Sequence, residues 1–128
     1  MTPHPTPSPE ADLIARLENA TEPDRANDGR IYIAAYGEAT GIAFYDKRTG
    51  GLVVRDDCPE FTGSIDAAVS LVPEGVDWGV DCRDEGDVDN WYEALVGEHL
   101  ASVKSTPAIA LCIASLRARA HAKETTDE

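Results

Sequence analysis

The segment Lys104-Ser105-Thr106, directly before a predicted helix, contains the residue types of an anion-binding site. The first backbone N–H groups of a helix have no partner within the helix, and the helix dipole favours negative charge there. A lysine and two hydroxyl groups beside such a helix start could together hold a phosphate. The alternative is a simple cap, in which Thr106 accepts a hydrogen bond from the first turn and Lys104 stays exposed. The residue types favour the cap, and the phosphate site remains the alternative interpretation.

Aromatic residues a short way before that segment could provide a stacking surface. Trp91 and Tyr92 begin an alternating run that ends at Val96, and Trp78 lies in a second such run. Nucleotide bases stack on aromatic rings. Aromatic residues in alternating strands are more often half-buried against a core, and an exposed one also suits a contact between two copies of the chain. The candidate ligand-binding residues are therefore Trp91, Tyr92, Lys104, Ser105 and Thr106.

An acidic stretch between the two alternating runs has the composition of a calcium-binding loop. With Gly86 at the glycine position of an EF-hand, the ligand positions would hold Asp81, Glu85, Asp87 and Asp89. Arg83 would then stand at the third position and Tyr92 at the twelfth, where a bidentate glutamate is required. The flanks also alternate as strands do. A solvated acidic hairpin is the better interpretation, so we predict neither a metal nor a cofactor.

The other metal-binding and nucleophilic residue types form no motif. A metal site would need distant histidines to converge, because the three are His4, His99 and His121. No CxxC pair occurs among the three cysteines, which are Cys58, Cys82 and Cys112. No local feature pairs His99 with any of these cysteines as a catalytic base. Phosphate-loop, dinucleotide-binding and nucleophile-elbow motifs are also missing, so no enzyme activity is predicted.

The composition excludes several classes of partner. The chain has 128 residues, which suits one domain with its own core, and a net charge of −13 at pH 7. Nucleic-acid affinity depends on Lys and Arg displacing counterions, so we expect no nucleic-acid binding, and the charge also disfavours an anionic membrane. The charge favours solubility and also allows a surface that imitates nucleic acid. The odd cysteine count and the lack of a signal peptide or bilayer-spanning run predict free thiols and a cytoplasmic location.

The spacing of apolar residues, together with the capping, Pro and Gly residues, predicts the helices and strands that position these residues. A proline-rich disordered tail is expected at 1–8, a single domain at 9–121 and a frayed polar tail at 122–128. Helices are predicted at 9–20, 65–72 and 107–121. Strands are predicted at 31–36, 42–45, 52–55, 76–80 and 91–96. The last helix is apolar almost all round its first turns and should be deeply buried.

The order of these elements predicts an α+β fold. Every connection can be local, so the prediction is a largely antiparallel five-stranded sheet with three helices packed on it, in the order α-β-β-β-α-β-β-α. The strand Leu52-Val53-Val54 carries apolar residues on both sides, which favours helices on both faces of the sheet.

Three stretches carry a family resemblance. They are Asp12-Leu13-Ile14-Ala15-Arg16-Leu17-Glu18, Thr62-Gly63-Ser64-Ile65-Asp66-Ala67-Ala68 with Leu71-Val72-Pro73-Glu74-Gly75, and Thr106-Pro107-Ala108-Ile109-Ala110-Leu111-Cys112-Ile113-Ala114 with Leu116-Arg117-Ala118-Arg119. Together they resemble the small phage and prophage proteins of the phage ABA sandwich domain family. The resemblance covers the three predicted helices but not residues 29–51. It implies an α-β-α sandwich and a phage or prophage origin, and it implies no catalytic residues.

Two functional hypotheses of different class follow. The first is a non-enzymatic anti-defence sponge that sequesters a small anionic nucleotide signal in the host cytoplasm, by analogy with other small phage proteins. The second is an acidic inhibitor, or DNA mimic, that binds a basic host protein. Its candidate residues are Asp81, Asp84, Glu85, Asp87 and Asp89. A homo-oligomer is compatible with either hypothesis, and an enzyme ranks third.

Overall fold

The computed structural model describes residues 9–83 and 91–126 of the chain. Its helices are α1 (Pro9–Glu18), α2 (Arg25–Tyr36), α3 (Ile65–Val69) and α4 (Pro107–Thr126). Its strands form two separate antiparallel sheets: β1 (Ala43–Tyr45) with β2 (Leu52–Val54), and β3 (Trp78–Arg83), β4 (Trp91–Val96) and β5 (His99–Val103) in that order. The fold is α+β, as predicted, but the predicted single five-stranded sheet with three helices is wrong.

Several predicted boundaries are confirmed by their hydrogen bonds. Ser64 caps α3, because its side chain accepts a bond from the N–H of Ala67 at 3.2 Å. Thr106 caps α4 by accepting from the N–H of Ile109 at 3.0 Å. The helix α4 continues past its predicted end near His121 to Thr126. The predicted tail at 1–8 lies outside the described residues.

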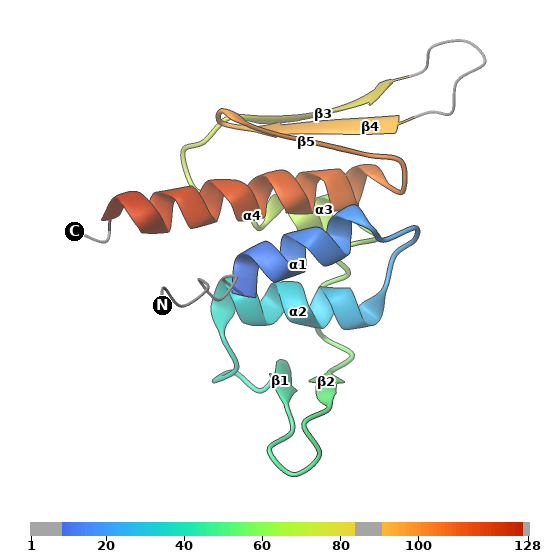
Figure 1. The fold of residues 1–128 in the computed structure, drawn as a ribbon, viewed down its shortest axis with the longest axis vertical. Coiled ribbons are helices and arrows are strands. Elements are labelled where there is room, and N and C mark those ends of the chain that lie inside the picture. Colours follow the sequence, from blue (N-terminus) through green and yellow to red (C-terminus); the bar gives the residue numbers. More distant parts are fainter. Residues whose placement is uncertain (1–8, 84–90, 127–128) are drawn as a thin grey trace, which may run out of the picture.

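The helix α4 lies in the middle of the fold (Figure 1). The sheet β3–β4–β5 packs along one side of it, mainly through β4 and β5, while α1 and α3 pack along the other side. Helix α2 packs on α1, and the hairpin β1–β2 packs on α2 at the far end of the molecule. The chain therefore forms successive layers. Helix α4 lies between two halves of the molecule: the sheet β3–β4–β5 on one side, and the other helices with the hairpin β1–β2 on the other.

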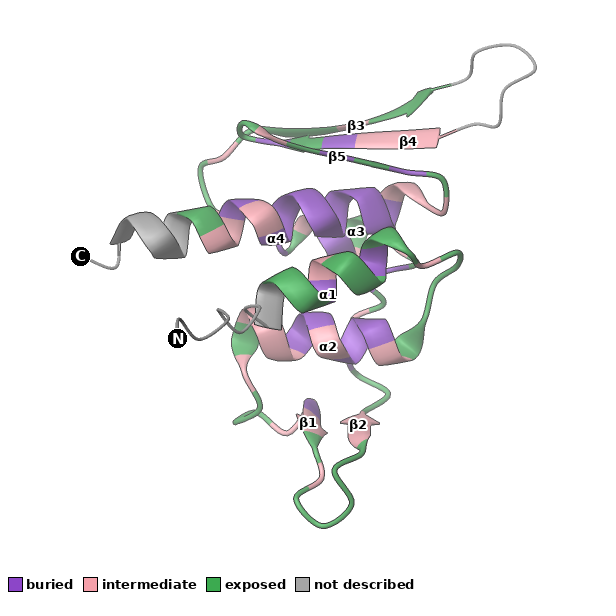
Figure 2. Ribbon diagram, viewed as in Figure 1, coloured by how far each residue is buried: buried purple, intermediate pink, exposed green. Residues whose placement is uncertain are grey.

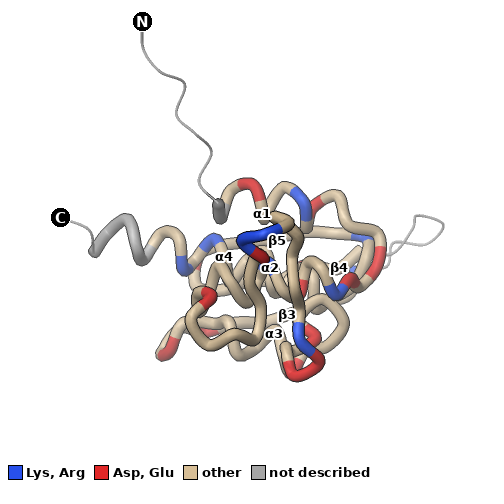
Figure 3. The backbone as a smooth tube through the Cα atoms, turned by 90° about the horizontal axis from the view of Figure 1, so that it is seen from below, with Lys and Arg blue, Asp and Glu red and all other residues tan. Residues whose placement is uncertain are grey.

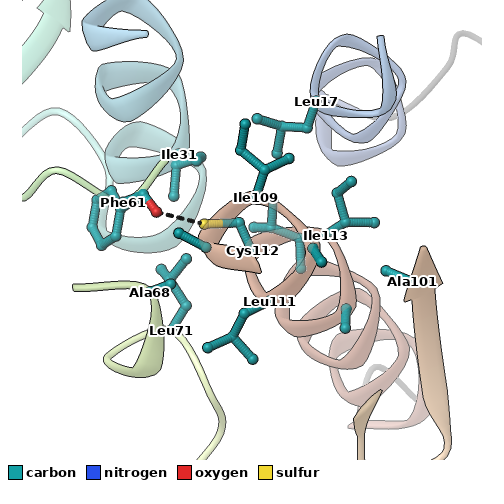
Figure 4. Packing of buried hydrophobic residues seen from close by; sticks show 14 of the residues in the cluster. Leu17, Ile31, Phe61, Ala68, Leu71, Ala101, Ile109, Leu111, Cys112 and Ile113 are labelled. Atoms are coloured by element: carbon teal, nitrogen blue, oxygen red, sulfur yellow. Dashed lines mark hydrogen bonds between the residues drawn. The ribbon is translucent and has the colours of Figure 1, made fainter. Parts of the chain in front are cut away.

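Burial follows from this central position of α4. Every residue from Ala108 to Leu116 is buried, as the purple stretch of α4 in Figure 2 shows. An ordinary surface helix buries only one stripe, whereas this one is apolar almost all round, as its sequence predicted. Figure 4 shows the side chains that surround it, which come from both halves: Leu17, Ile31, Phe61, Ala68, Leu71 and Ala101.

The predicted strand at 31–36 is wrong, because those residues belong to α2. Their side chains are all aliphatic or aromatic, so a helix and a strand fit equally well, and Asp28-Gly29 pointed to a loop. In the structure Asp24 caps the helix, accepting from the N–H of Ala26 at 2.8 Å. Asp28 and Gly29 lie inside the helix and are buried. Both residues are poor helix formers, so tertiary contacts must account for their presence.

The buried carboxylate of Asp28 binds the segment that precedes α3. Its Oδ1 atom accepts from the backbone N–H of Thr62 at 2.8 Å and from the Thr62 hydroxyl at 2.7 Å. Its Oδ2 atom accepts from Arg25 Nη1 at 3.0 Å. A buried carboxylate is tolerated only when it is paired and hydrogen-bonded in this way. We refer to this arrangement as the Asp28–Thr62 contact.

The strand β5 was not predicted from the sequence. A two-residue turn joins it to β4, and Gly97 in that turn has φ +60°, which favours glycine. The buried residues of β5 are Ala101 and Val103. They give only a weak indication of a strand in the sequence, because alanine is small and common.

The expectation of helices on both faces of the sheet is also wrong. Leu95 and Leu100 point away from α4 and are 46% and 55% exposed, and no described helix covers them.

Gly29 provides a test of how α2 and the hairpin pack. A Cβ atom at this position would lie 2.3 Å from Cγ2 of Val54 in β2. Gly29→Ala gains about 1 kcal/mol in helix propensity, yet overpacking typically costs about 1–3 kcal/mol, so we expect a net loss of stability. Val54→Ala in the same background should restore much of that loss. A double-mutant cycle in urea measures the coupling, and additive effects would contradict this close contact.

Candidate functional site

Three of the five candidate residues line one groove. The groove encloses about 720 Å³ and lies between the end of α1 and the strand β5. Its lining residues are Glu18, Asn19, Ala20, Thr21, Trp91, Ser102, Val103, Lys104 and Ser105. We call it the α1–β5 groove. Its volume falls within the range of pockets that hold small ligands.

Strand register brings Trp91 and Lys104 together. Tyr92 pairs with Val103 at the end of the β4–β5 ladder, and Trp91 and Lys104 are the residues next to that pair, both in the lining of the groove. Side chains opposite each other in an antiparallel pair project from the same face of the sheet. An indole ring and an ammonium group are therefore neighbours on one wall of the groove, although 13 positions separate them in the sequence.

The charges around the groove are partly neutralised. Glu18 forms an ion pair with Arg117 Nη2 at 2.9 Å, and Arg117 Nη1 donates to the backbone oxygen of Leu100 at 2.9 Å. This arginine links α1 to β5 across α4. Lys104 takes part in none of the ion pairs found among the described residues. Its ammonium group is exposed and can meet an anion.

Thr106 and Tyr92 do not belong to this site. The Thr106 hydroxyl donates to the backbone oxygen of Thr62 at 3.0 Å and accepts from the first turn of α4, so the cap interpretation of this residue holds. Tyr92 is partly buried and packs against the core. Trp91, one position earlier, faces the other way, as alternation along a strand requires.

Sequence reasoning missed the wall that α1 contributes. Asn19, Ala20 and Thr21 follow the last helical residue of α1 and line the groove. They carry no binding motif, and only the packing of α1 on α4 brings them beside β5. No local signal could have identified them.

A second groove, between α1 and α2, is less suited to an anion. It encloses about 530 Å³, and its arginines are Arg16 and Arg30. Arg16 Nε pairs with Asp12 at 3.3 Å, and Arg30 Nη1 donates to the Asn27 side chain at 2.9 Å. Glu22 and Asp24 also line it. Its cations are engaged, and carboxylates outnumber them.

The metal hypotheses gain no support from the described residues. Within residues 9–83 and 91–126, no three His, Cys, Asp or Glu side chains are arranged to hold a metal ion. His99 and His121 do converge, with ring centroids 5.3 Å apart, while His4 lies outside the described residues. Most of the acidic loop also lies outside them, namely Asp84, Glu85, Asp87 and Asp89. Asp81 is described, and its carboxylate lies 4.0 Å from Arg83.

The three thiols are free and occupy different environments. Cys82 is exposed, whereas Cys58 and Cys112 are buried. Burial raises the pKa of the Cys112 thiol far above its ordinary value, and the nearby Asp28 carboxylate adds to the rise. The Cys112 thiol donates to the backbone oxygen of Phe61 at 3.2 Å, the dashed line in Figure 4. For Cys58 burial also raises the pKa, against an opposing effect of Arg25. Both buried thiols are therefore structural rather than nucleophilic.

The comparisons with known proteins leave the site to be judged on its geometry. No family model, curated protein or solved structure matches the chain. Among the described helices, none combines the length and the apolar character needed to cross a membrane.

The raised pKa of Cys112 predicts a pH effect on stability. Above pH about 8.5 the thiol ionises in the unfolded chain but stays protonated in the folded one, so each further pH unit costs about 1.4 kcal/mol. Cys112→Ser keeps a donor for Phe61 and does not titrate, so its stability should fall less steeply above that pH. Urea unfolding between pH 8 and 10 measures both slopes. The exposed Cys82→Ser is the matched control, and equal slopes for the two variants would contradict the prediction.

Proposed function

We propose that the α1–β5 groove binds a small anionic ligand that carries an aromatic ring, with a nucleotide as the chemical class. The observation that carries this proposal is that Trp91 and Lys104 lie next to the end pair of the β4–β5 ladder and line the same groove. An aromatic face stacks on a base, and an ammonium group attracts a phosphate. Both groups are needed for one ligand, and here they are neighbours.

The electrostatic setting strengthens the case for this groove over the rest of the surface. In Figure 3, acidic and basic segments occur around the whole outline of the described chain, with no side given over to one sign. An anion approaching a protein of net charge −13 needs a place where a cation is available. Lys104 is available there, and Glu18 beside it is compensated by Arg117. Ser102 and Ser105 add polar groups to the lining.

Binding without reaction is the role that we propose for this site. The lining contributes hydrogen-bonding groups, one indole ring and one free ammonium group, which suffice to hold a nucleotide. In the setting implied by the resemblance to phage proteins, such a protein would sequester a nucleotide signal of the host's defence. The anti-defence role rests on that resemblance, and the ligand class rests on the groove.

Tryptophan fluorescence can test the proposal directly. Trp78→Phe leaves Trp91 as the only tryptophan, so any quenching reports on the groove. We expect AMP, ADP-ribose or cyclic di-AMP to quench this signal saturably. In the same background, Lys104→Ala should weaken the binding about tenfold, or about 1.4 kcal/mol.

Lys47→Ala is the matched control for that variant. Lys47 is an exposed lysine in the β1–β2 turn, on the other side of α2 from the groove. It should leave the affinity unchanged. The proposal is wrong if none of the three nucleotides quenches Trp91 at millimolar concentration, or if both lysine substitutions weaken binding equally.

A further inference from the structure

Two imidazole rings meet where the later part of α4 passes the start of β5. His121 belongs to α4, and His99 is the first residue of β5. Their ring centroids are 5.3 Å apart. The side chain of His121 is 52% exposed and His99 is partly buried, so an ion can reach both rings from solvent. Histidine is the commonest metal ligand among the side chains.

Rigid elements position the two rings. Alternation along β5 puts His99 on the same side as Ala101, which is buried where β5 packs on α4. One helical turn before His121, Arg117 donates to the backbone oxygen of Leu100, the neighbour of His99, at 2.9 Å. This bond holds the start of β5 against α4 where the rings meet. A site that is ordered in advance loses less conformational entropy when a ligand binds.

The separation of the rings suits two histidines that share one metal ion. Nitrogen ligands of a tetrahedral zinc ion lie about 2.0–2.1 Å from the metal, which puts two imidazole centres roughly 5 Å apart. The observed separation of 5.3 Å is close to that value. Rotation of the side chains, without movement of the backbone, would bring one nitrogen of each ring to the ion.

The surroundings of the rings favour a positive ion. Glu98, in the turn between β4 and β5, has a carboxylate oxygen 3.9 Å from Nε2 of His121. That distance is too long for a hydrogen bond, so the ring nitrogen is free to bind a metal. In the described part of the chain, it is also the one polar contact that either ring makes. A carboxylate beside the rings, on a protein of net charge −13, attracts cations.

We propose that His99 and His121 bind a divalent transition-metal ion of the class of Zn²⁺. Imidazole nitrogen suits Zn²⁺, Cu²⁺ and Ni²⁺, whereas Ca²⁺ and Mg²⁺ prefer oxygen ligands. The two histidines are the protein ligands, water completes the shell, and Glu98 balances charge. Such a site agrees with the lack of a three-residue metal cluster within residues 9–83 and 91–126. The rings lie at the start of β5 and Lys104 follows its end, so the inference does not depend on the nucleotide proposal.

Calorimetry with Zn²⁺ tests the proposal in the full-length protein. The protein carries Cys82→Ser, because the exposed Cys82 thiol is another potential zinc ligand. Excess Mg²⁺ in the buffer occupies the acidic surface and leaves the imidazoles free. We expect one saturable Zn²⁺ site per chain. His99→Asn and His121→Asn should each weaken it at least about tenfold, because the second imidazole binds as an intramolecular ligand.

His4→Asn is the matched control, because it removes the third histidine of the sequence and should leave the affinity unchanged. Two further readouts locate the ion. Without any histidine substitution, the imidazole C–H signals of His99 and His121 should shift in NMR spectra when Zn²⁺ is added. Zn²⁺ should also raise the melting temperature, since the two rings converge only in the folded chain. His121→Asn, at an exposed position that the fold should tolerate, should abolish that rise.

Several results would overturn the proposal. Absence of saturable Zn²⁺ binding at millimolar concentration would show that the two rings do not form a site. Displacement of Zn²⁺ by an equal concentration of Mg²⁺ would show attraction by charge alone. An unaltered affinity in both His99→Asn and His121→Asn, or a loss in His4→Asn as large as theirs, would place the ion elsewhere. Binding that leaves the signals of both rings unshifted would do the same.

Discussion

The position of α4 depends on the Asp28–Thr62 contact. A carboxylate that is 2% exposed must satisfy its oxygens from within the protein, and Thr62 supplies two donors to a single one of them. The same short segment is bound from the other side. Thr106 donates to the backbone oxygen of Thr62, and the Cys112 thiol donates to that of Phe61. The buried Asp28 carboxylate therefore orders the segment before α3. That segment contacts the start of α2 on one side and the first turns of α4 on the other.

The α1–β5 groove depends indirectly on this arrangement. Ser105 and Lys104 immediately precede the cap of α4, so fixing Thr106 also fixes where they lie. Arg117, three turns further along α4, binds α1 through Glu18 and β5 through Leu100. Both walls of the groove are thus attached to α4. The sheet register then determines that Trp91, rather than Tyr92, faces the ligand space.

Local signals predicted the parts of the fold that local chemistry controls. Thr106 and Ser64 both cap helices as their residue types indicate, and α4 is buried all round as its composition indicates. The failures occur where a residue serves a distant partner. Asp28 and Gly29 look like loop residues because their reasons for being in a helix, Thr62 and Val54, lie more than 20 positions away. For the same reason, Lys104 and Trp91 could be named separately as candidates, whereas the α1 wall of their groove could not.

The central helix is also the last described element to be synthesised. Helices α1, α2 and α3 precede it along the chain, and their buried residues, such as Leu17, Ile31 and Ala68, belong to the core that surrounds residues 108–116. On the ribosome, the earlier elements therefore emerge with apolar faces and no helix to cover them. Vectorial folding from the N-terminus cannot complete this core step by step. The core can be completed only when α4 becomes available to the elements on both of its sides.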